Sequence, residues 1–157
     1  MKLNIGCGVW RPAGYTTYDM YDTTADVQGD ARKLPYSDNS IEEILASHLL
    51  EHFDFKEAFG VLEEWKRVLI PGGRLILEVP NLENICRNFV DDPSSRVNLY
   101  IQIFGAPWFP GHEHKFGYSP EQLVWTLQTA GFKDIVRRPT QRYTDLGDLC
   151  IRYEACK

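Results

Sequence analysis

A helix followed at once by a strand is encoded in residues 54–79, DFKEAFGVLEEWKRVLIPGGRLILEV. Asp54 and Glu57 have the spacing of a capping box and predict the start of the helix. The apolar residues that follow recur on one helical face: Phe55, Phe59, Leu62, Trp65 and Leu69. Pro71-Gly72-Gly73 predicts the end of the helix. Residues 74–79 then form a strand that is apolar on both sides in its middle, which is typical of a parallel strand covered by helices.

The same alternation continues along the chain. A second helix is predicted from Ser119 as N-cap, with Pro120 at its first position, to Gly131. Seven segments have the apolar runs of strands: 2–5, 15–18, 26–28, 43–47, 73–79, 132–138 and 149–156. Strands that alternate with helices predict an α/β fold with a parallel, doubly wound sheet. A ligand is then expected at the carboxyl ends of the strands, after Ile5, Tyr18, Gln28, Ser47 and Val79.

Length and composition indicate one globular domain, residues 1–157. The hydrophobic share is 43% and the charged share 25%, which excludes a disordered chain. No apolar run reaches the roughly 18 residues of a membrane span, and the N-terminus lacks the pattern of a signal peptide. We therefore expect a cytoplasmic protein that does not associate with membranes.

Charge and cysteine spacing exclude two further classes of site. The net charge is -5, from 17 basic and 22 acidic residues, so nucleic acid is not expected as a partner. The densest basic cluster is interrupted by Pro139 and is expected to be a solvated edge: Arg137, Arg138 and Arg142. The four cysteines show no Cys-x-x-Cys spacing and are expected to be free thiols: Cys7, Cys86, Cys150 and Cys156.

The first strand leads into a glycine turn, Asn4-Ile5-Gly6-Cys7-Gly8, whose glycines allow close approach of the backbone to a ligand. A dinucleotide site would need a third glycine, where Arg11 stands, and a helix that faces the pyrophosphate. Only six residues separate Gly8 from Tyr15, whereas a helical crossover needs about a dozen. The turn therefore predicts a site for a nucleoside without a phosphate, with Asp19 holding the ribose hydroxyls. A plain structural turn and an NAD site are the weaker alternatives.

Two segments carry the histidines. His48-Leu49-Leu50-Glu51-His52 matches the His-x-x-Glu-His pattern of some zinc peptidases. No metal is expected, because the segment leaves a strand and no third ligand has a recognisable spacing. Residues 105–118 form a long loop rich in glycine, proline and aromatic residues, and it contains His112 and His114. Such a loop predicts an acceptor-binding wall, or aromatic residues that only pack against the sheet.

Five motifs occur in order along the chain: LNIGCG (3–8), YD (18–19), GDARKLPY (29–36), ASHLLEH (46–52) and EWKRVLIPGGRL (64–75). Together they resemble the class I S-adenosylmethionine-dependent methyltransferases of the type 11 group. HEHKFGY (112–118), with the helix that follows it, resembles a small bacterial-type branch of that group. The resemblance extends over nearly the whole chain. It implies a Rossmann-like, seven-stranded, mostly parallel sheet whose last strand is antiparallel. The sequence departs from the wider family in two places, because many such enzymes have helices before the first strand and a fuller helix after the glycine turn, whereas a minimal N-terminus and a stunted turn are expected here.

The resemblance also implies positions for S-adenosyl-L-methionine. The methionine side would be lined by residues of the first and fourth motifs: Gly6, Cys7, Gly8, Ser47 and His48. Asn4 is also expected to bind the cofactor. Asp19 would hold the ribose and Met20 would touch the adenine. Asp30 and Ala31 would bind the adenine edge.

The function expected is methyl transfer to a small polar acceptor, such as a hydroxyl of a sugar or metabolite. Transfer from a sulfonium is an in-line displacement, so the protein mainly aligns the acceptor and, for a hydroxyl, removes a proton. His112 and His114 are the candidate bases, because imidazole titrates near neutral pH. The alternative is a cofactor-binding, partner-dependent subunit without a complete acceptor site. A homodimer is compatible with either function.

Overall fold

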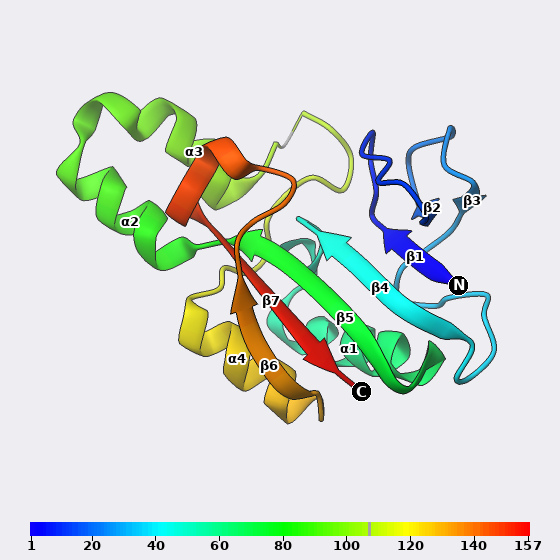
Figure 1. Ribbon diagram of the computed structural model, residues 1–157. Helices are drawn as coiled ribbons and strands as arrows, with labels where there is room; N and C mark the ends of the chain where they lie inside the picture. The colour runs from blue at the N-terminus through cyan, green and yellow to red at the C-terminus, as the bar shows by residue number, and fades with distance from the viewer. Residues whose placement is uncertain (107) are drawn as a thin grey trace.

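A computed structural model describes residues 1–106 and 108–157, and its seven strands form one sheet (Figure 1). The order in the sheet is β3-β2-β1-β4-β5-β7-β6. The strands are β1 (Lys2–Ile5), β2 (Thr16–Asp19), β3 (Val27–Gln28), β4 (Ile41–Ser47), β5 (Leu69–Pro80), β6 (Lys133–Arg138) and β7 (Cys150–Cys156). All pairs are parallel except those that β7 makes with β5 and β6. The predicted sheet, mostly parallel with an antiparallel last strand, is confirmed.

The helices in the described residues are α1 (Phe55–Val68), α2 (Leu82–Asp91), α3 (Arg96–Phe104) and α4 (Pro120–Thr129), with 3-10 helices η1 (Leu50–His52), η2 (Pro93–Ser95) and η3 (Thr144–Leu149). The predicted capping box at Asp54 is formed, and Ser119 caps α4. The sequence did not predict α2 and α3. Each buries only one residue, Ile85 or Leu99. The apolar residues of α2 nevertheless recur at helical spacing, at Leu82, Ile85, Cys86, Phe89 and Val90, so the sequence carried a signal for this helix that the prediction did not use. None of these helices combines the length and the apolar character needed to cross a membrane.

One face of the sheet carries the apolar core. Leu3 in β1 and Leu75 in β5 are fully buried on this face, where they belong to one cluster with side chains of α1 and α4. Figure 1 shows both helices behind the sheet. Trp65 of α1 is also fully buried, and its indole N–H donates to the carbonyl of Ala31 at 2.9 Å. Each large apolar side chain buried in this way contributes about 1.5–3 kcal/mol to stability.

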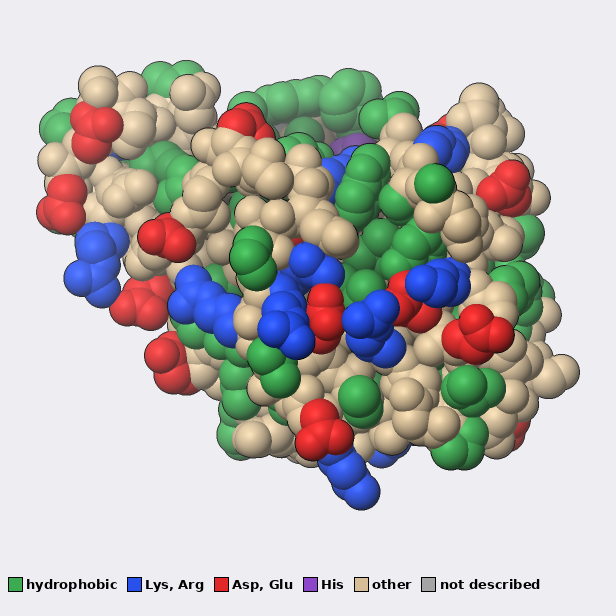
Figure 2. Space-filling model, viewed as in Figure 1, with side chains coloured by type: hydrophobic (Ala, Val, Ile, Leu, Met, Phe, Trp, Pro, Cys, Tyr) green, Lys and Arg blue, Asp and Glu red, His purple; other side chains and the backbone are tan. Residues whose placement is uncertain are grey.

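The opposite face of the same strands is polar. Arg74 of β5 pairs with Glu43 of β4 and with Glu154 of β7, and acidic and basic side chains alternate across the middle of this face (Figure 2). Tyr15 donates to Glu43, and Arg152 donates to the carbonyl of Pro139. The last two contacts come from the segments 6–15 and 139–143. Irregular segments therefore contact a face for which a doubly wound sheet predicts helices, and charged side chains stay exposed on it.

The junction between α1 and β5 differs from the prediction. The helix ends at Val68, and β5 already begins at Leu69 rather than at Gly73. Leu69 pairs with Ile41, and a register shift follows before Arg74 pairs with Glu43. The Pro71-Gly72-Gly73 segment therefore forms an irregularity inside the strand. The residues before and after it pair with β4, and this pairing holds them in extended backbone.

Candidate cofactor and acceptor site

A cleft of about 410 Å³ lies at the carboxyl ends of the parallel strands. Its floor and one wall follow β1 to β4, and include Gly6, Gly8, Asp19, Met20, Tyr21, residues 29–32, His48 and Leu49. The other wall comes from α3, the loop 105–115, Arg142 and Tyr143. Figure 2 shows this hollow near the top of the view, with histidine and basic side chains inside it. Four of the five predicted strand ends therefore contribute to the lining. The end of β5 does not, because the chain turns there into α2.

The glycine turn and Asp19 form one unit at the floor of the cleft. Gly6 and Gly8 have φ angles of 61° and 48°, which favour glycine. The amide of Gly8 donates to Oδ2 of Asp19 at 2.8 Å. Oδ1 accepts from the amides of Tyr21 and Asp22 at 2.8 and 2.9 Å. A carboxylate oxygen can accept two hydrogen bonds, so Oδ2 keeps capacity for a hydroxyl in the cleft.

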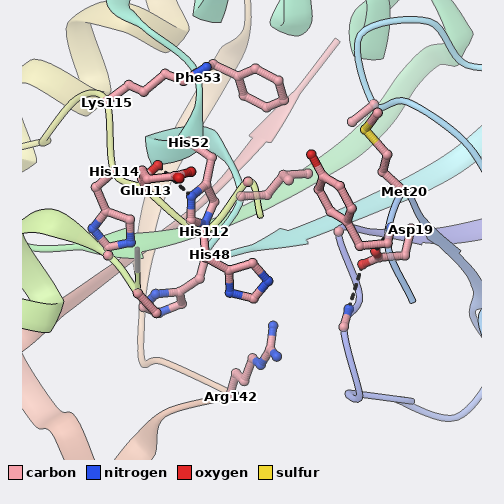
Figure 3. Close-up of a pocket in the computed structure, with 18 of the residues that line it drawn as sticks. Asp19, Met20, His48, His52, Phe53, His112, Glu113, His114, Lys115 and Arg142 are labelled. Carbon is pink, nitrogen blue, oxygen red and sulfur yellow. Dashed lines mark hydrogen bonds between the residues drawn. The ribbon is translucent and has the colours of Figure 1, made fainter. Parts of the chain in front are cut away.

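The predicted adenine residues lie together beside this floor. Asp30 accepts from Arg32 at both oxygens, at distances of 2.7 to 3.0 Å. The hydrogen bonds from Arg32 lower the pKa of Asp30, so its carboxylate is ionised near neutral pH. Ala31 is held by its carbonyl, which accepts from Trp65. Met20 is exposed at the rim, next to Asp19 (Figure 3).

Three of the predicted cofactor residues are not part of the lining. Asn4 donates to the carbonyl of Trp10 at 3.0 Å, and Ser47 donates to Glu78 at 3.2 Å. The side chain of Cys7 is fully buried. The side chains of Asn4 and Ser47 are used in these internal hydrogen bonds and that of Cys7 is enclosed, whereas Gly6, Gly8 and His48 border the cleft. They support the strand ends from behind.

All four histidines of the chain line the cleft (Figure 3). His48 has a φ of 55°, and its ring meets Tyr143 edge-on with centroids 4.5 Å apart. His52 follows from η1, and His112 and His114 come from the loop. His112 is exposed at the rim, whereas His114 is half-buried. Burial lowers the pKa of His114, so its imidazole is neutral near pH 7. The two predicted catalytic histidines are thus in the cleft, but in different environments.

The loop 105–118 is both packed and exposed. The amides of Lys115 and Phe116 donate to the carbonyl of Glu51 at 2.8 and 3.2 Å, which fixes the loop to η1. Phe116 packs against Phe55, whereas Trp108 and Phe109 remain exposed at the outer rim. Pro107, which belongs to this predicted segment, lies outside the described residues. The packing interpretation of the loop is therefore confirmed for Phe116, while the acceptor-binding wall stays a prediction.

Arg142 is the site residue that the sequence analysis assigned wrongly. Arg137 and Arg138 are exposed on β6, as predicted. Arg142 is half-buried in the cleft, where its guanidinium lies 5.7 Å from the ring of Trp10 and donates to the carbonyl of Ser47 at 3.3 Å. Its Nη2 lies 3.4 Å from the position that a Cβ on Gly8 would occupy. A signal was present: Arg142 follows the carboxyl end of the strand 132–138, as the other site residues follow theirs.

Comparison with known proteins agrees with this geometry. Residues 3–77 match the family model described as a methyltransferase domain. The chain carries a class I S-adenosylmethionine-dependent methyltransferase domain. The predicted family is thereby confirmed.

Relatives of this methyltransferase domain differ in the acceptors for which they are named. The ubiquinone/menaquinone biosynthesis C-methyltransferase UbiE of Desulfotalea psychrophila is 43% identical over 122 residues, 68% of this chain and 45% of the relative. The human probable tRNA methyltransferase 9B is 31% identical over 98 residues, 59% of this chain and 21% of the relative. The chain thus spans less than half the length of these curated relatives.

A solved structure resembles the domain over nearly its full length. It is an S-adenosylmethionine-dependent methyltransferase of Thermotoga maritima, described as a possible histamine N-methyltransferase. The TM-score is 0.69 and the identity 18%, covering 99% of this chain and 81% of the other. At this identity the likeness establishes the fold and not the acceptor.

Proposed function

We propose that this domain transfers the methyl group of S-adenosyl-L-methionine to a small polar acceptor, such as a hydroxyl of a sugar or metabolite. The observation that carries this proposal is the division of the cleft into two walls (Figure 3). Asp19, Met20 and Asp30 lie on one wall, while His52, His112 and His114 lie on the other. A nucleoside on the first wall would present its sulfonium to an acceptor on the second.

The residues proposed to hold the cofactor each face a different part of it. S-adenosylmethionine supplies an electrophilic methyl group on a sulfonium. Gly6 and Gly8 leave room for its methionine part, which His48 borders, and Asp19 has acceptor capacity left for a ribose hydroxyl. Asp30, Ala31 and Met20 lie where the adenine would extend, while Asn4, Cys7 and Ser47 hold the turn from behind.

Arg142 completes the cofactor side of the proposed site. Its guanidinium lies above Gly8, so it is placed to pair with the carboxylate of the methionine part. Aromatic contacts with Trp10 and Tyr143 hold it there, at 5.7 and 5.2 Å from the ring centroids. A positive charge fixed in a concave site attracts an anionic group without the entropy cost of ordering a free side chain.

His112 is the candidate general base. Nδ1 of His114 bonds to the carbonyl of Gln102 at 3.1 Å, and its Nε2 lies 3.9 Å from Glu51. His114 is therefore held by the backbone at Nδ1, and its Nε2 faces the buried Glu51. His112 is exposed at the rim of the cleft and has no such engagement with Glu51, so it can accept a proton from a bound acceptor. The lining from α3 and the loop supports an acceptor site within this chain over a partner-dependent subunit.

Further expectations accompany this proposal. The catalytic unit is one domain, residues 1–157, that works in the cytoplasm on a small molecule and not on nucleic acid, alone or as a homodimer. The relative named as a C-methyltransferase makes a carbon acid the second candidate acceptor, because it too requires removal of a proton.

The decisive experiment follows the transfer of a labelled methyl group from S-adenosylmethionine to an acceptor. The purified chain is incubated with methyl-labelled S-adenosylmethionine and fractionated cell extract, and the labelled product is identified. A labelled O-methyl metabolite is the expected result. A C-methyl product would favour the second candidate. Labelled RNA, or no label although S-adenosylhomocysteine binds, would contradict the small-molecule proposal.

A further inference from the structure

Glu51 lies behind the histidine wall as a buried carboxylate without a hydrogen-bond partner. Only 1% of this residue is exposed, and neither carboxylate oxygen accepts a hydrogen bond from any residue in the described parts of the chain. Nδ1 of His48 lies 3.4 Å from Oε1, but it is not aligned for a hydrogen bond. A buried carboxylate in this state is unfavourable unless a positive group faces it.

The ionisation of Glu51 depends on the imidazoles around it. Burial by itself raises its pKa, but the imidazoles of His48, His52 and His114 lower it by more. The carboxyl group is therefore an anion near neutral pH. The pKa of His114, however, is lowered by burial, so this ring adds no full positive charge at that pH. Among the described residues, only the imidazoles of His48 and His114 pair with the Glu51 carboxylate within 4.0 Å, and no Lys or Arg does.

The two neighbouring histidines each present one free ring nitrogen. Nδ1 of His52 lies 3.0 Å from the carbonyl oxygen of Glu113, and Nδ1 of His114 lies 3.1 Å from that of Gln102 (Figure 3). A carbonyl can only accept, so both Nδ1 atoms must carry the proton. In the neutral rings Nε2 then keeps its lone pair. This is the arrangement in which backbone carbonyls orient histidine ligands of metals.

We propose that Glu51, His52 and His114 bind a divalent transition-metal cation of the zinc class at the acceptor side of the cleft. Their ligand atoms all lie within 4.8 Å of one another. Zinc binds imidazole nitrogen and carboxylate oxygen at about 2.0–2.2 Å, so the side chains would move inward by about 1 Å. Two imidazoles and one carboxylate form a donor set that leaves the fourth position open. The sequence did not predict His114 as the third ligand, because it is far from Glu51 in the chain and only the path of the loop places it beside η1.

The position of the cluster assigns a role to the cation, and this step rests on the proposed function. His52 and His114 border the cleft, while Glu51 lies behind them. The open position therefore faces the acceptor and would take an oxygen of it. A hydroxyl bound to a divalent cation loses its proton more readily. His112 lies beside the cluster, with its ring centroid 6.1 Å from that of His52, and is placed to accept this proton. The favoured acceptors are those with an oxygen that can bind the metal.

The test is a titration of the untagged, chelator-treated chain with zinc chloride, followed by calorimetry without cofactor or acceptor. One saturable site is expected in the wild type. Glu51→Gln and His114→Asn should each weaken binding by roughly 100-fold, the upper end for disturbed metal sites. His112→Asn is the matched control and should bind zinc as the wild type does. Magnesium chloride should not compete, because Mg²⁺ prefers oxygen ligands.

Two further measurements separate this site from zinc binding at the cysteines and from misfolding of the variants. Cobalt chloride should give the absorption of a nitrogen and oxygen site without a thiolate charge-transfer band, which excludes the free cysteines. Circular dichroism checks the fold of each variant, and His114→Asn carries the test should Glu51→Gln fail to fold. No saturable zinc binding, a thiolate band, or equal binding by all variants would overturn the proposal. Binding of S-adenosylhomocysteine is measured separately, so failure of the metal site and failure of the proposed function are distinguishable.

Discussion

The amide of Gly8 donates to Oδ2 of Asp19 at 2.8 Å, and this hydrogen bond joins the ends of β1 and β2 at the floor of the cleft. The carboxylate that is proposed to hold the ribose therefore also shapes the turn that is proposed to admit the methionine part. Tests of either residue need a control that separates loss of binding from loss of structure.

Asp19→Ala should weaken the binding of S-adenosylhomocysteine by about 1.5–3 kcal/mol, the range for hydrogen bonds to a charged group. Calorimetry measures this. Asp22→Ala is the matched control, because Asp22 pairs with Arg11 and Thr24 outside the cleft lining. Unchanged affinity in a folded Asp19→Ala variant would refute the ribose assignment.

Gly8→Val should abolish cofactor binding while the chain still folds. Gly8 and Gly14 have φ angles of 48° and 84°, so a side chain at either position costs about 1–2 kcal/mol of stability. A Cβ on Gly8 would point toward Arg142, whereas one on Gly14 would meet no described atom within 4 Å. Gly14→Val is therefore the control with similar strain, and it should bind S-adenosylhomocysteine normally. Equal affinities of the two variants would mean that the turn is only structural.

Arg142→Gln should weaken S-adenosylhomocysteine binding by about 1–2 kcal/mol, a value reduced for the partial exposure of the guanidinium. Methylthioadenosine has no amino-acid carboxylate, so its affinity should not change. Arg138→Gln, on the exposed strand β6, is the control for net charge. If the variant weakens both ligands equally, Arg142 acts through the shape of the cleft and not through the carboxylate.

His112→Gln should lower the rate of methyl transfer by roughly 10² to 10⁴ with little effect on cofactor affinity, because a base acts on the acceptor proton. The acid limb of the pH–rate profile should disappear with it. Glu113→Gln changes the adjacent exposed side chain and should keep the rate. Near-normal rates of His112→Gln at about pH 6–8 would mean that alignment alone suffices or that another group is the base.

Metal-free protein should lose stability as the pH falls below about 6.5, the ordinary pKa of histidine. Burial lowers the pKa of His114 in the folded state, so in this window the unfolded chain binds a proton that the folded chain does not. The lowered pKa of Glu51 acts in a separate window, below about 4.5, where its stabilisation is lost. Urea unfolding at several pH values should therefore show a slope near pH 6 that His114→Asn reduces. An unchanged slope would place the titrating group elsewhere.

The sequence by itself determined the elements whose signals are local. The caps at Asp54 and Ser119, the alternation of strands and helices, and the shortage of residues between Gly8 and Tyr15 depend on neighbours in the chain. They correctly predicted the sheet and the side on which the cleft opens. The helices α2 and α3 were not predicted, although α2 has apolar residues at helical spacing, Leu82, Ile85 and Phe89. Periodicity also did not reveal that Ile85 and Leu99 are the only residues that these two helices bury.

Only the tertiary structure decided which side chains share the cleft. Glu51 and His114 are far apart in the sequence, and the loop brings them within 3.9 Å through backbone hydrogen bonds to η1. Arg142 reaches Gly8 because β6 runs parallel to β5, so that its carboxyl end meets the same edge of the sheet. Such contacts depend on strand order and on the path of a long loop. Hydrophobic periodicity carries no information about either.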